Sequence, residues 1–168
     1  MVLDLKQLFG SNDGAKALNA EFNLSDVEFS GVFPITTPVR ITGEVLSKTG
    51  IVSLSAIIEA DYSADCDRCG IPATKHYSIP VSRILVTELA SEEESDDMLV
   101  LPEMKLDLYE LVLTEVVLNI PSKHLCKEDC KGICQQCGKN LNEGACDCNH
   151  KEVDPRLAVL LDLLKDDE

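Results

Sequence analysis

Short alternations of apolar and polar residues dominate the first 90 positions of the chain. Residues 39–45 (Val-Arg-Ile-Thr-Gly-Glu-Val) alternate with period two, as a half-buried strand does. A turn signal, Lys48-Thr49-Gly50, separates them from the β-branched run 51–62, which predicts the returning strand of a hairpin. Residues 76–89 fit a third strand, after a turn around 66–72. Because these connections are short, the pattern predicts antiparallel strands.

The pattern becomes helical at 107–119. Asp107 and Glu110 occupy the N-cap and N3 positions of a capping box, and Pro121 ends the segment. Its apolar residues cover most of the helix circumference, so we expect this central helix to be buried on the sheet. The predicted fold class is α+β, an antiparallel β-sheet packed by a central helix, with a C-terminal cysteine-rich zinc module and a final helix.

The C-terminal part of the chain predicts one more helix. Asp154-Pro155 supplies an N-cap and a first-turn proline for residues 156–165, whose leucines form one stripe. We therefore expect three parts: a β-rich domain at 1–120, a cysteine-rich metal-binding module at 121–152, and a helix with an acidic tail at 153–168.

Eight cysteines are the most informative feature of the composition. The N-terminus does not read as a secretory signal, because Asp4 and Lys6 interrupt its apolar run. No apolar stretch approaches the roughly 18 residues that a membrane helix needs. We therefore expect a cytoplasmic protein whose thiols stay reduced and act as metal ligands or redox groups. The cysteines fall into four pairs: Cys66-x2-Cys69, Cys126-x3-Cys130, Cys134-x2-Cys137 and Cys146-x-Cys148.

Two such pairs supply the four thiolates of one tetrahedral zinc site, so eight cysteines predict two zinc ions per chain. Gly70 and Gly138 directly follow the second cysteine of two pairs, where a glycine permits the positive φ of a tight turn. The most specific unit runs from Cys134 to Cys148, since both its half-sites lie within 15 residues. His150 is a spare candidate ligand there.

The other two pairs are less easily assigned. A metal that joined Cys66 and Cys69 to Cys126 and Cys130 would clamp the sheet to the segment after the helix, but nothing local fixes this pairing. His124 could replace Cys126 or Cys130. A buried free thiol pair or a reversible disulfide is the alternative, and an iron–sulfur cluster also takes four thiolates.

The charge limits the possible partners. The chain has 30 acidic and 15 basic residues, a net charge of −15, and 4% aromatic residues. This balance argues against a protein that coats nucleic acid through its whole surface, and it leaves room for a local site. Residues 88–97 hold six acidic residues and no basic one, which indicates a solvated loop or an acidic contact for a basic partner.

Catalytic patterns are weak. Two closed cysteine tetrads leave no open coordination position, no P-loop glycine motif is present, and His76, His124 and His150 belong to no recognisable group. We expect no enzyme and no small-molecule substrate.

The order of motifs resembles the YceD family, the large ribosomal RNA subunit accumulation proteins. The resemblance is carried by residues 65–70 (Asp-Cys-Asp-Arg-Cys-Gly), the helix ending in Asn119-Ile120-Pro121, the cysteine-rich run 125–148 and Asp154-Pro155-Arg156-Leu157. It implies a role in ribosome assembly without an established catalytic activity. Since some family members keep only the first Cys-x2-Cys and a His/Cys pair after the helix, it also implies that Cys66 and Cys69 pair with Cys126 and Cys130.

Together these patterns predict a non-enzymatic zinc-binding factor that meets large-subunit rRNA, a basic ribosomal protein, or both. An acidic chaperone for a basic ribosomal protein and a thiol redox or zinc-donor protein are the alternatives. Eight thiolates and two Zn²⁺ ions would take the formal charge from −15 to −19. Residues 123–151 of the cysteine-rich segment have five lysines against four acidic residues, and these lysines either contact RNA or only keep the module soluble: Lys123, Lys127, Lys131, Lys139 and Lys151.

Overall fold

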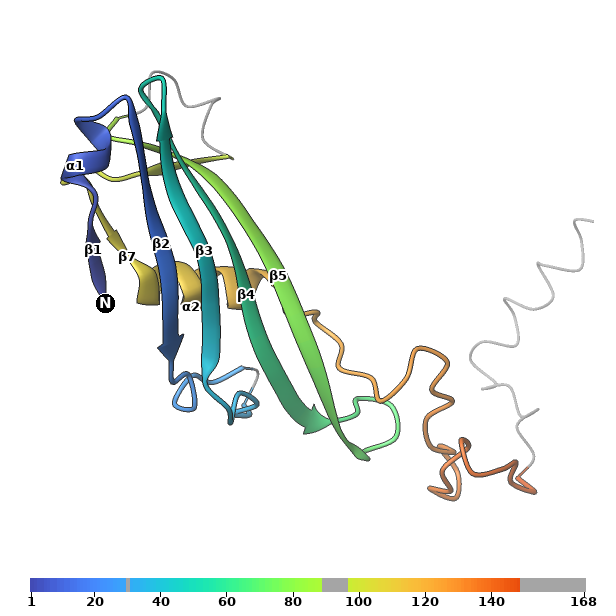
Figure 1. Ribbon diagram of the computed structural model, residues 1–168. Helices are drawn as coiled ribbons and strands as arrows, with labels where there is room; N and C mark the ends of the chain where they lie inside the picture. The colour runs from blue at the N-terminus through green and yellow to red at the C-terminus, as the bar shows by residue number, and fades with distance from the viewer. Residues whose placement is uncertain (30, 89–96, 149–168) are drawn as a thin grey trace, which may run out of the picture.

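A curved sheet with one helix across one face forms the body of the protein (Figure 1). The computed structural model describes residues 1–29, 31–88 and 97–148. In chain order the elements are β1 (Val2–Asp4), α1 (Lys6–Phe9), β2 (Asp13–Phe22), β3 (Val39–Lys48), β4 (Ile51–Asp65), β5 (Pro72–Val86), β6 (Met98–Val100), β7 (Lys105–Asp107) and α2 (Leu108–Asn119).

The predicted hairpin is confirmed as β3–β4. Lys48 pairs with Ile51, so the loop has two residues, Thr49 and Gly50. Both have positive φ (51° and 84°), as a type I′ turn requires, and this turn matches the twist of its strands. Both strands are longer than predicted, because backbone pairing continues to Lys48 in β3 and to Asp65 in β4, beyond the residues that alternate between apolar and polar.

The main sheet has the order β2-β3-β4-β5-β6, and its first three pairs are antiparallel, as predicted. The purely antiparallel sheet is wrong at one edge. β6 pairs in parallel with residues Ile84, Leu85 and Val86 of β5, since Met98 lies beside Ile84 and the two strands run in the same direction from there. β1 and β7 form a separate two-stranded sheet.

Helix α2 begins and ends where the sequence indicated. The Asp107 side chain caps it by accepting a hydrogen bond from the Tyr109 backbone N–H at 2.9 Å. At the other end Ile120 is extended (ψ 125°), because the proline ring at 121 disfavours helical backbone in the preceding residue.

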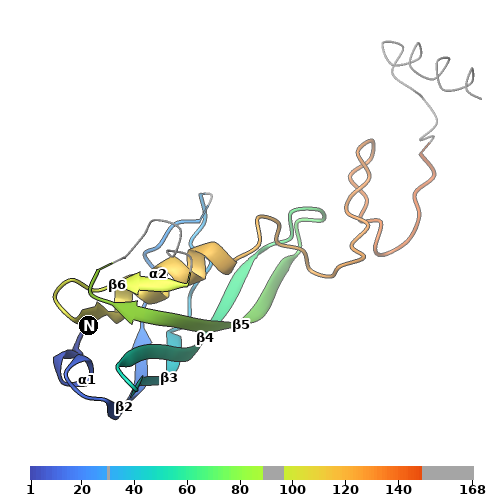
Figure 2. The ribbon, with the colours of Figure 1, turned by 90° about the horizontal axis from the view of Figure 1, so that it is seen from above.

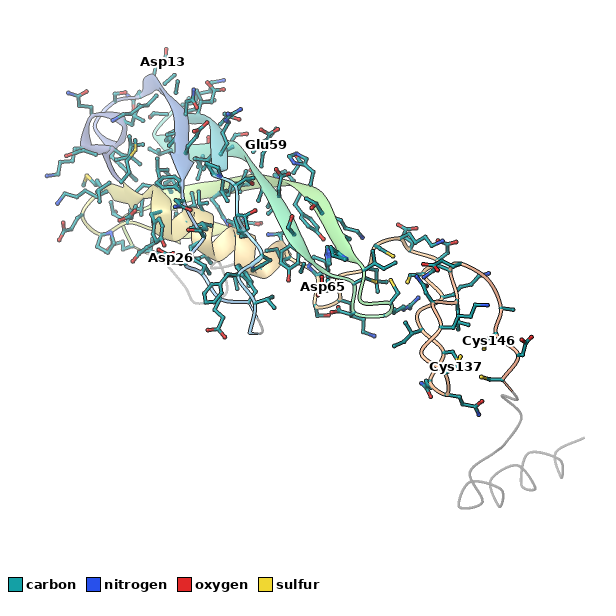
Figure 3. All side chains as sticks on the ribbon, turned by 90° about the horizontal axis from the view of Figure 1, so that it is seen from below. Asp13, Asp26, Glu59, Asp65, Cys137 and Cys146 are labelled. Atoms are coloured by element: carbon teal, nitrogen blue, oxygen red, sulfur yellow. The ribbon has the colours of Figure 1, made fainter. Side chains whose placement is uncertain are left out.

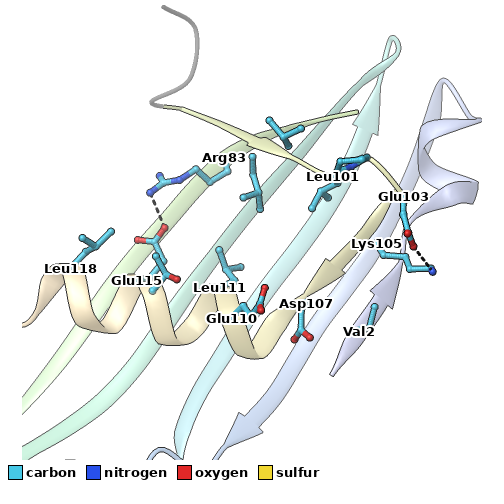
Figure 4. A pocket seen from close by; sticks show the side chains of 14 residues that line it. Val2, Arg83, Leu101, Glu103, Lys105, Asp107, Glu110, Leu111, Glu115 and Leu118 are labelled. Atoms are coloured by element: carbon cyan, nitrogen blue, oxygen red, sulfur yellow. Dashed lines mark hydrogen bonds and ion pairs between the residues drawn. The ribbon is translucent and has the colours of Figure 1, made fainter. Parts of the chain in front are cut away.

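The core lies between the sheet and α2. Leu108, Val112 and Val116 of α2 belong to one cluster with the inward residues of the strands, such as Ile41 and Leu54. The salt bridge from Arg83 of β5 to Glu115 of α2 (2.7 Å) lies in a cavity beside β6 and is drawn in Figure 4.

Burial of α2 is one-sided, although its apolar residues cover most of its circumference. Val117 is 48% exposed and Leu118 is 71% exposed, since no described element covers that face.

A two-stranded arm projects from the sheet. β3 pairs with β4 as far as Arg40 and Glu59, but β4 and β5 stay paired to Asp65 and Pro72. Figures 1 and 2 both show these ends extending past β3 and α2 toward the C-terminal segment. The arm therefore carries the turn that holds Cys66 and Cys69 away from the core.

Three sequence predictions lie wholly or largely outside the described residues: the helix at 156–165, His150, and most of the acidic segment 88–97. Among the described residues no helix has the length and apolar character needed to cross a membrane.

Candidate metal centres

The proximal tetrad consists of Cys66, Cys69, Cys126 and Cys130. The first two lie in the turn at the tip of the arm, and the other two follow α2. The four Sγ atoms lie within 4.8 Å of one another. Cys66 Sγ is 3.8 Å from Cys130 Sγ, and Cys69 Sγ is 3.6 Å from Cys126 Sγ. The structure thus brings together residues that are 57 and 64 positions apart.

These spacings fit a metal. Four sulfurs placed tetrahedrally at 2.3 Å from a zinc ion are about 3.8 Å apart. A disulfide needs sulfurs about 2.05 Å apart, and none of the eight cysteines, all of them described, forms one. Three of the proximal thiols are buried and Cys126 is half-buried, so the site is closed to solvent on most sides.

Glycines close the two Cys-x2-Cys turns as predicted. Gly70 has φ 68°, and its N–H donates to the Cys66 carbonyl at 2.8 Å. Gly138 has φ 72° and donates in the same way to the Cys134 carbonyl at 2.9 Å. Since residues with a Cβ rarely adopt this conformation, each glycine lets the chain turn directly behind its second cysteine.

Backbone N–H groups favour the thiolate form of Cys66. Burial raises the pKa of this thiol, but hydrogen bonds from the backbone of Cys126, Arg68 and Cys69 outweigh it and lower the pKa to about 6. Burial, together with hydrogen bonding to the other thiols, raises the pKa of Cys126 to about 12. The same N–H groups would stabilise the negative charge of a metal-bound thiolate at Cys66.

His124 does not join the proximal tetrad, so its predicted role as a replacement ligand is wrong. The ring Nε2 lies 2.9 Å from the Ala73 carbonyl oxygen, and the centroids of the His124 and Tyr62 rings are 4.9 Å apart. Its backbone N–H donates to the Asp67 carboxylate at 2.6 Å, and its carbonyl accepts from the Asp67 N–H at 2.9 Å. His124 therefore fastens the chain after α2 to the arm.

The distal tetrad consists of Cys134, Cys137, Cys146 and Cys148, whose Sγ atoms also lie within 4.8 Å of one another. It is more open than the proximal tetrad: Cys134 is buried, Cys137 is exposed, and the other two are half-buried. A small antiparallel bridge between Ile133 and Asn140 supports its first turn. Figure 3 shows Cys137 and Cys146 near the end of the described residues, well away from the strands of the sheet.

The distal thiols repeat the electrostatic pattern of the proximal ones. Hydrogen bonds from the backbone of Cys137 and Gln136 lower the pKa of Cys134 to about 6. Hydrogen bonding with the Cys137 thiol and burial raise the pKa of Cys148 to about 12. The first cysteine of each Cys-x2-Cys turn is thus the one most readily ionised.

Two side chains that the spacing did not reveal connect the tetrads. The Arg68 guanidinium donates to the Cys130 carbonyl at 2.8 Å, and the Arg68 carbonyl accepts from the Ile133 N–H at 3.2 Å. The Asn142 side-chain amide, in the distal loop, donates to Cys130 Sγ at 3.4 Å and lowers the pKa of that thiol. No sequence signal separates Asn142 from the other amides of this segment.

The lysines of the module are partly engaged within it. Lys139 Nζ donates to the Ala145 carbonyl at 2.7 Å, and Lys127 Nζ lies 3.9 Å from the Asp129 carboxylate. Two of the five lysines therefore already have partners within the module.

Relatives of the chain come from bacteria and plants. It is 29% identical to an uncharacterized protein, YlbN, of Bacillus subtilis over 79% of this chain and 77% of the relative. It is 27% identical to the chloroplastic large ribosomal RNA subunit accumulation protein YCED homolog 1 of Arabidopsis thaliana, over 73% of this chain and 47% of that protein. An uncharacterized protein of Mycobacterium bovis, Mb2951c, is 27% identical over 67% of this chain and 56% of its own length.

The chain therefore spans most of the Bacillus relative but about half of the plant and mycobacterial ones. No solved structure gives a significant match. The sequence family described as "Large ribosomal RNA subunit accumulation protein YceD" matches residues 54–164, which include the arm, α2 and both tetrads. On this match the chain belongs to the YceD family.

Proposed function

We propose that the protein is a non-enzymatic zinc-binding factor that supports the accumulation of large-subunit rRNA during ribosome assembly. The observation that carries this proposal is the pair of closed cysteine tetrads in a chain of the YceD family. Four thiolates complete the tetrahedral coordination of zinc, so the metal would have a structural role and no free position for a substrate.

The proximal site would hold the C-terminal module, residues 121–152, against the arm. Its ligands come from two segments that are also joined by two hydrogen bonds between Asp67 and His124 and by the Arg68–Cys130 hydrogen bond. A metal would fix this junction and so present the arm and the module as one surface. Thiolate ligands of this kind need a reducing compartment, as the cytoplasm provides.

The direct test begins with the metal content of the purified full-length chain. Elemental analysis should give two zinc ions per chain, and Cys66→Ser or Cys134→Ser should each remove one. A strain that lacks the protein should then regain large-subunit rRNA with the wild-type gene and fail to do so with the variant Cys66→Ser/Cys69→Ser. Normal rRNA levels with both tetrads destroyed would contradict the proposal.

A second candidate, a redox or zinc-donor function, is favoured by the exposure of Cys137. A thiol that acts as a nucleophile must be accessible and ionised, and only the distal tetrad meets the first condition. Thiol counting under native conditions separates the candidates: rapid reaction of two distal thiols supports the redox function, and protection of all eight supports the structural one.

A further inference from the structure

A cavity of about 600 Å³ lies where the arm meets the end of α2. Three segments line it: the loop at Phe29 and Val32, residues 62–65 of the arm with Asp67 of the adjoining turn, and the chain from Val117 to His124. This volume is within the range of about 300–1,000 Å³ that ligand sites usually have. The cavity is separate from both tetrads, since none of the eight cysteines lines it.

His124, which lines this cavity, has a ring nitrogen for which the described residues offer no partner. The side chain is 4% exposed, and its Nε2 must carry the ring hydrogen because its partner at Ala73 is a carbonyl oxygen, which only accepts. In the neutral ring the other nitrogen, Nδ1, is an acceptor, and it is buried without a hydrogen-bond partner among the described residues. Buried polar atoms are nearly always paired, so Nδ1 indicates a missing donor.

The electrostatics of the cavity favour a cation. Asp65 and Asp67 both line it, and Figure 3 shows Asp65 at the end of β4. The C-terminal end of α2 also borders it through Val117 and Ile120, and the last turn of that helix has no basic residue to offset its negative dipole end. The described lining residues include no lysine or arginine.

The rest of the lining suits a long side chain with a charged end. Val117, Ile120 and Pro121 offer apolar surface to an aliphatic stem. The rings of Phe29 and Tyr62 contact each other edge to face at 6.3 Å, and aromatic faces attract cations. A guanidinium carries five N–H donors in a plane and can serve a carboxylate and a ring nitrogen together, which an ammonium does less well.

We propose that this cavity binds an arginine side chain from a basic segment of a protein partner, with the guanidinium donating to Asp65 and to Nδ1 of His124. RNA fits less well, because the carboxylates that attract a guanidinium repel phosphate. This inference rests on the proposed function, because ribosome assembly is the process in which the protein would encounter such a partner.

The first experiment uses the zinc-loaded full chain and a short Gly/Ser peptide with one central arginine. Backbone amide NMR shifts should change at 62–67 and 117–124 during the titration. A second peptide with citrulline in place of arginine keeps the shape and loses the charge, and we expect it to bind at least ten-fold more weakly. Equal binding of the two peptides, or no shift in these residues at the highest soluble concentration, would overturn the proposal.

Matched variants test the acidic contact. Asp65→Asn removes one carboxylate of the lining and leaves every cysteine in place, while Asp13→Asn makes the same change at the start of β2, at the end of the sheet opposite to Asp65 (Figure 3). With zinc content and amide spectrum unchanged, Asp65→Asn should weaken arginine-peptide binding about ten-fold and Asp13→Asn should not change it. Wild-type affinity in Asp65→Asn would contradict the inference.

The strain that lacks the protein separates this inference from the proposed function. If Asp65→Asn abolishes peptide binding yet fully restores large-subunit rRNA, the partner assignment is overturned and the zinc-dependent role stands. If variants without either tetrad restore rRNA, the proposed function fails whatever the peptide result. An RNA oligonucleotide that shifts the same amides and competes with the peptide would also overturn the choice of a protein partner.

Discussion

The two tetrads have the same ligands but join very different lengths of chain. The proximal tetrad links cysteines 57 and 64 residues apart, and three of its thiols are buried. The distal tetrad lies within one short segment and leaves Cys137 exposed. The first would act as a cross-link between the arm and the module, whereas the second would organise one loop.

The difference shows that identical metal ligands can stabilise different levels of structure. Closing a loop of about 60 residues restricts the unfolded chain more than closing one of about 15, by roughly 1 kcal/mol on chain entropy alone. Burial adds to this, because a shielded site loses its metal more slowly than an open one. The predictions below test whether the two sites differ in this way.

The largest effect is expected from Cys66→Ser/Cys69→Ser. A structural zinc site of this kind supplies about 10–16 kcal/mol of binding free energy, and its loss should release residues 121–130 from the arm. Hydrogen exchange should rise in that segment while β3, β4 and α2 keep their protection. Cooperative unfolding of the whole sheet in this variant would show that the module and the core are not separable.

The matched distal variant, Cys134→Ser/Cys137→Ser, should have a more local effect. It should lose one metal ion and the exchange protection of residues 131–148, because their order depends on contacts within the loop. The amides of Asp67 and His124 should stay protected. Equal loss of exchange protection in the two variants would contradict the inference that the proximal site joins two segments and the distal site orders only one loop.

Chelation should empty the sites in order. A chromophoric chelator reaches the exposed Cys137 side first, so zinc release should have two phases whose rates differ at least ten-fold. The cysteine variants assign the phases: the fast one should be missing from Cys134→Ser/Cys137→Ser. A single phase in the wild-type chain would contradict the difference in accessibility.

A smaller effect is expected from Asn142→Ala. Asn142 belongs to the distal loop but donates to the proximal Cys130 Sγ, so its removal should weaken the proximal site. Partners that hydrogen-bond to metal ligands typically change affinity 10–100-fold, and we expect the lower end for a neutral amide. Competition for cadmium followed by ¹¹³Cd NMR reports the two sites separately. The neighbouring Glu143→Gln should leave the proximal affinity unchanged.

The smallest effect is expected from Lys127→Glu, Lys131→Glu and Lys139→Glu combined. Because Lys139 and Lys127 already have partners within the module, binding of precursor rRNA should change less than two-fold. Filter binding at several salt concentrations measures this. A fall of ten-fold or more, with a shallower salt dependence, would identify the module as an RNA contact.

Sequence patterns revealed those features that depend on neighbours along the chain. The hairpin at Thr49 and Gly50 and the Asp107 cap follow from local conformational preferences, and both are confirmed. The distal cysteines likewise could be grouped from their spacing alone. The proximal pairing had no local signal, and only the resemblance to a family indicated it.

Other elements escaped because they depend on tertiary contacts. Strand β2 was missed because only Leu18 is fully buried among its ten residues: residues 18–22 alternate between apolar and polar, but the first half, 13–17, has no large apolar residue. The parallel pairing of β6 with β5 is a contact at the edge of the sheet that no local sequence pattern indicates. His124 looked like a ligand by its position near Cys126, but its partners are on β5 and the arm, which sequence order does not reveal.

The 64-residue gap between Cys66 and Cys130 also sets a delay during synthesis. At about 5–20 residues per second, the ribosome adds the second half of the proximal site roughly 3–13 seconds after the first. During that interval Cys66 and Cys69 supply only two of the four ligands that a metal ion needs. The distal tetrad closes within a few seconds of its first cysteine, so the two sites face oxidants and free metal for very different times.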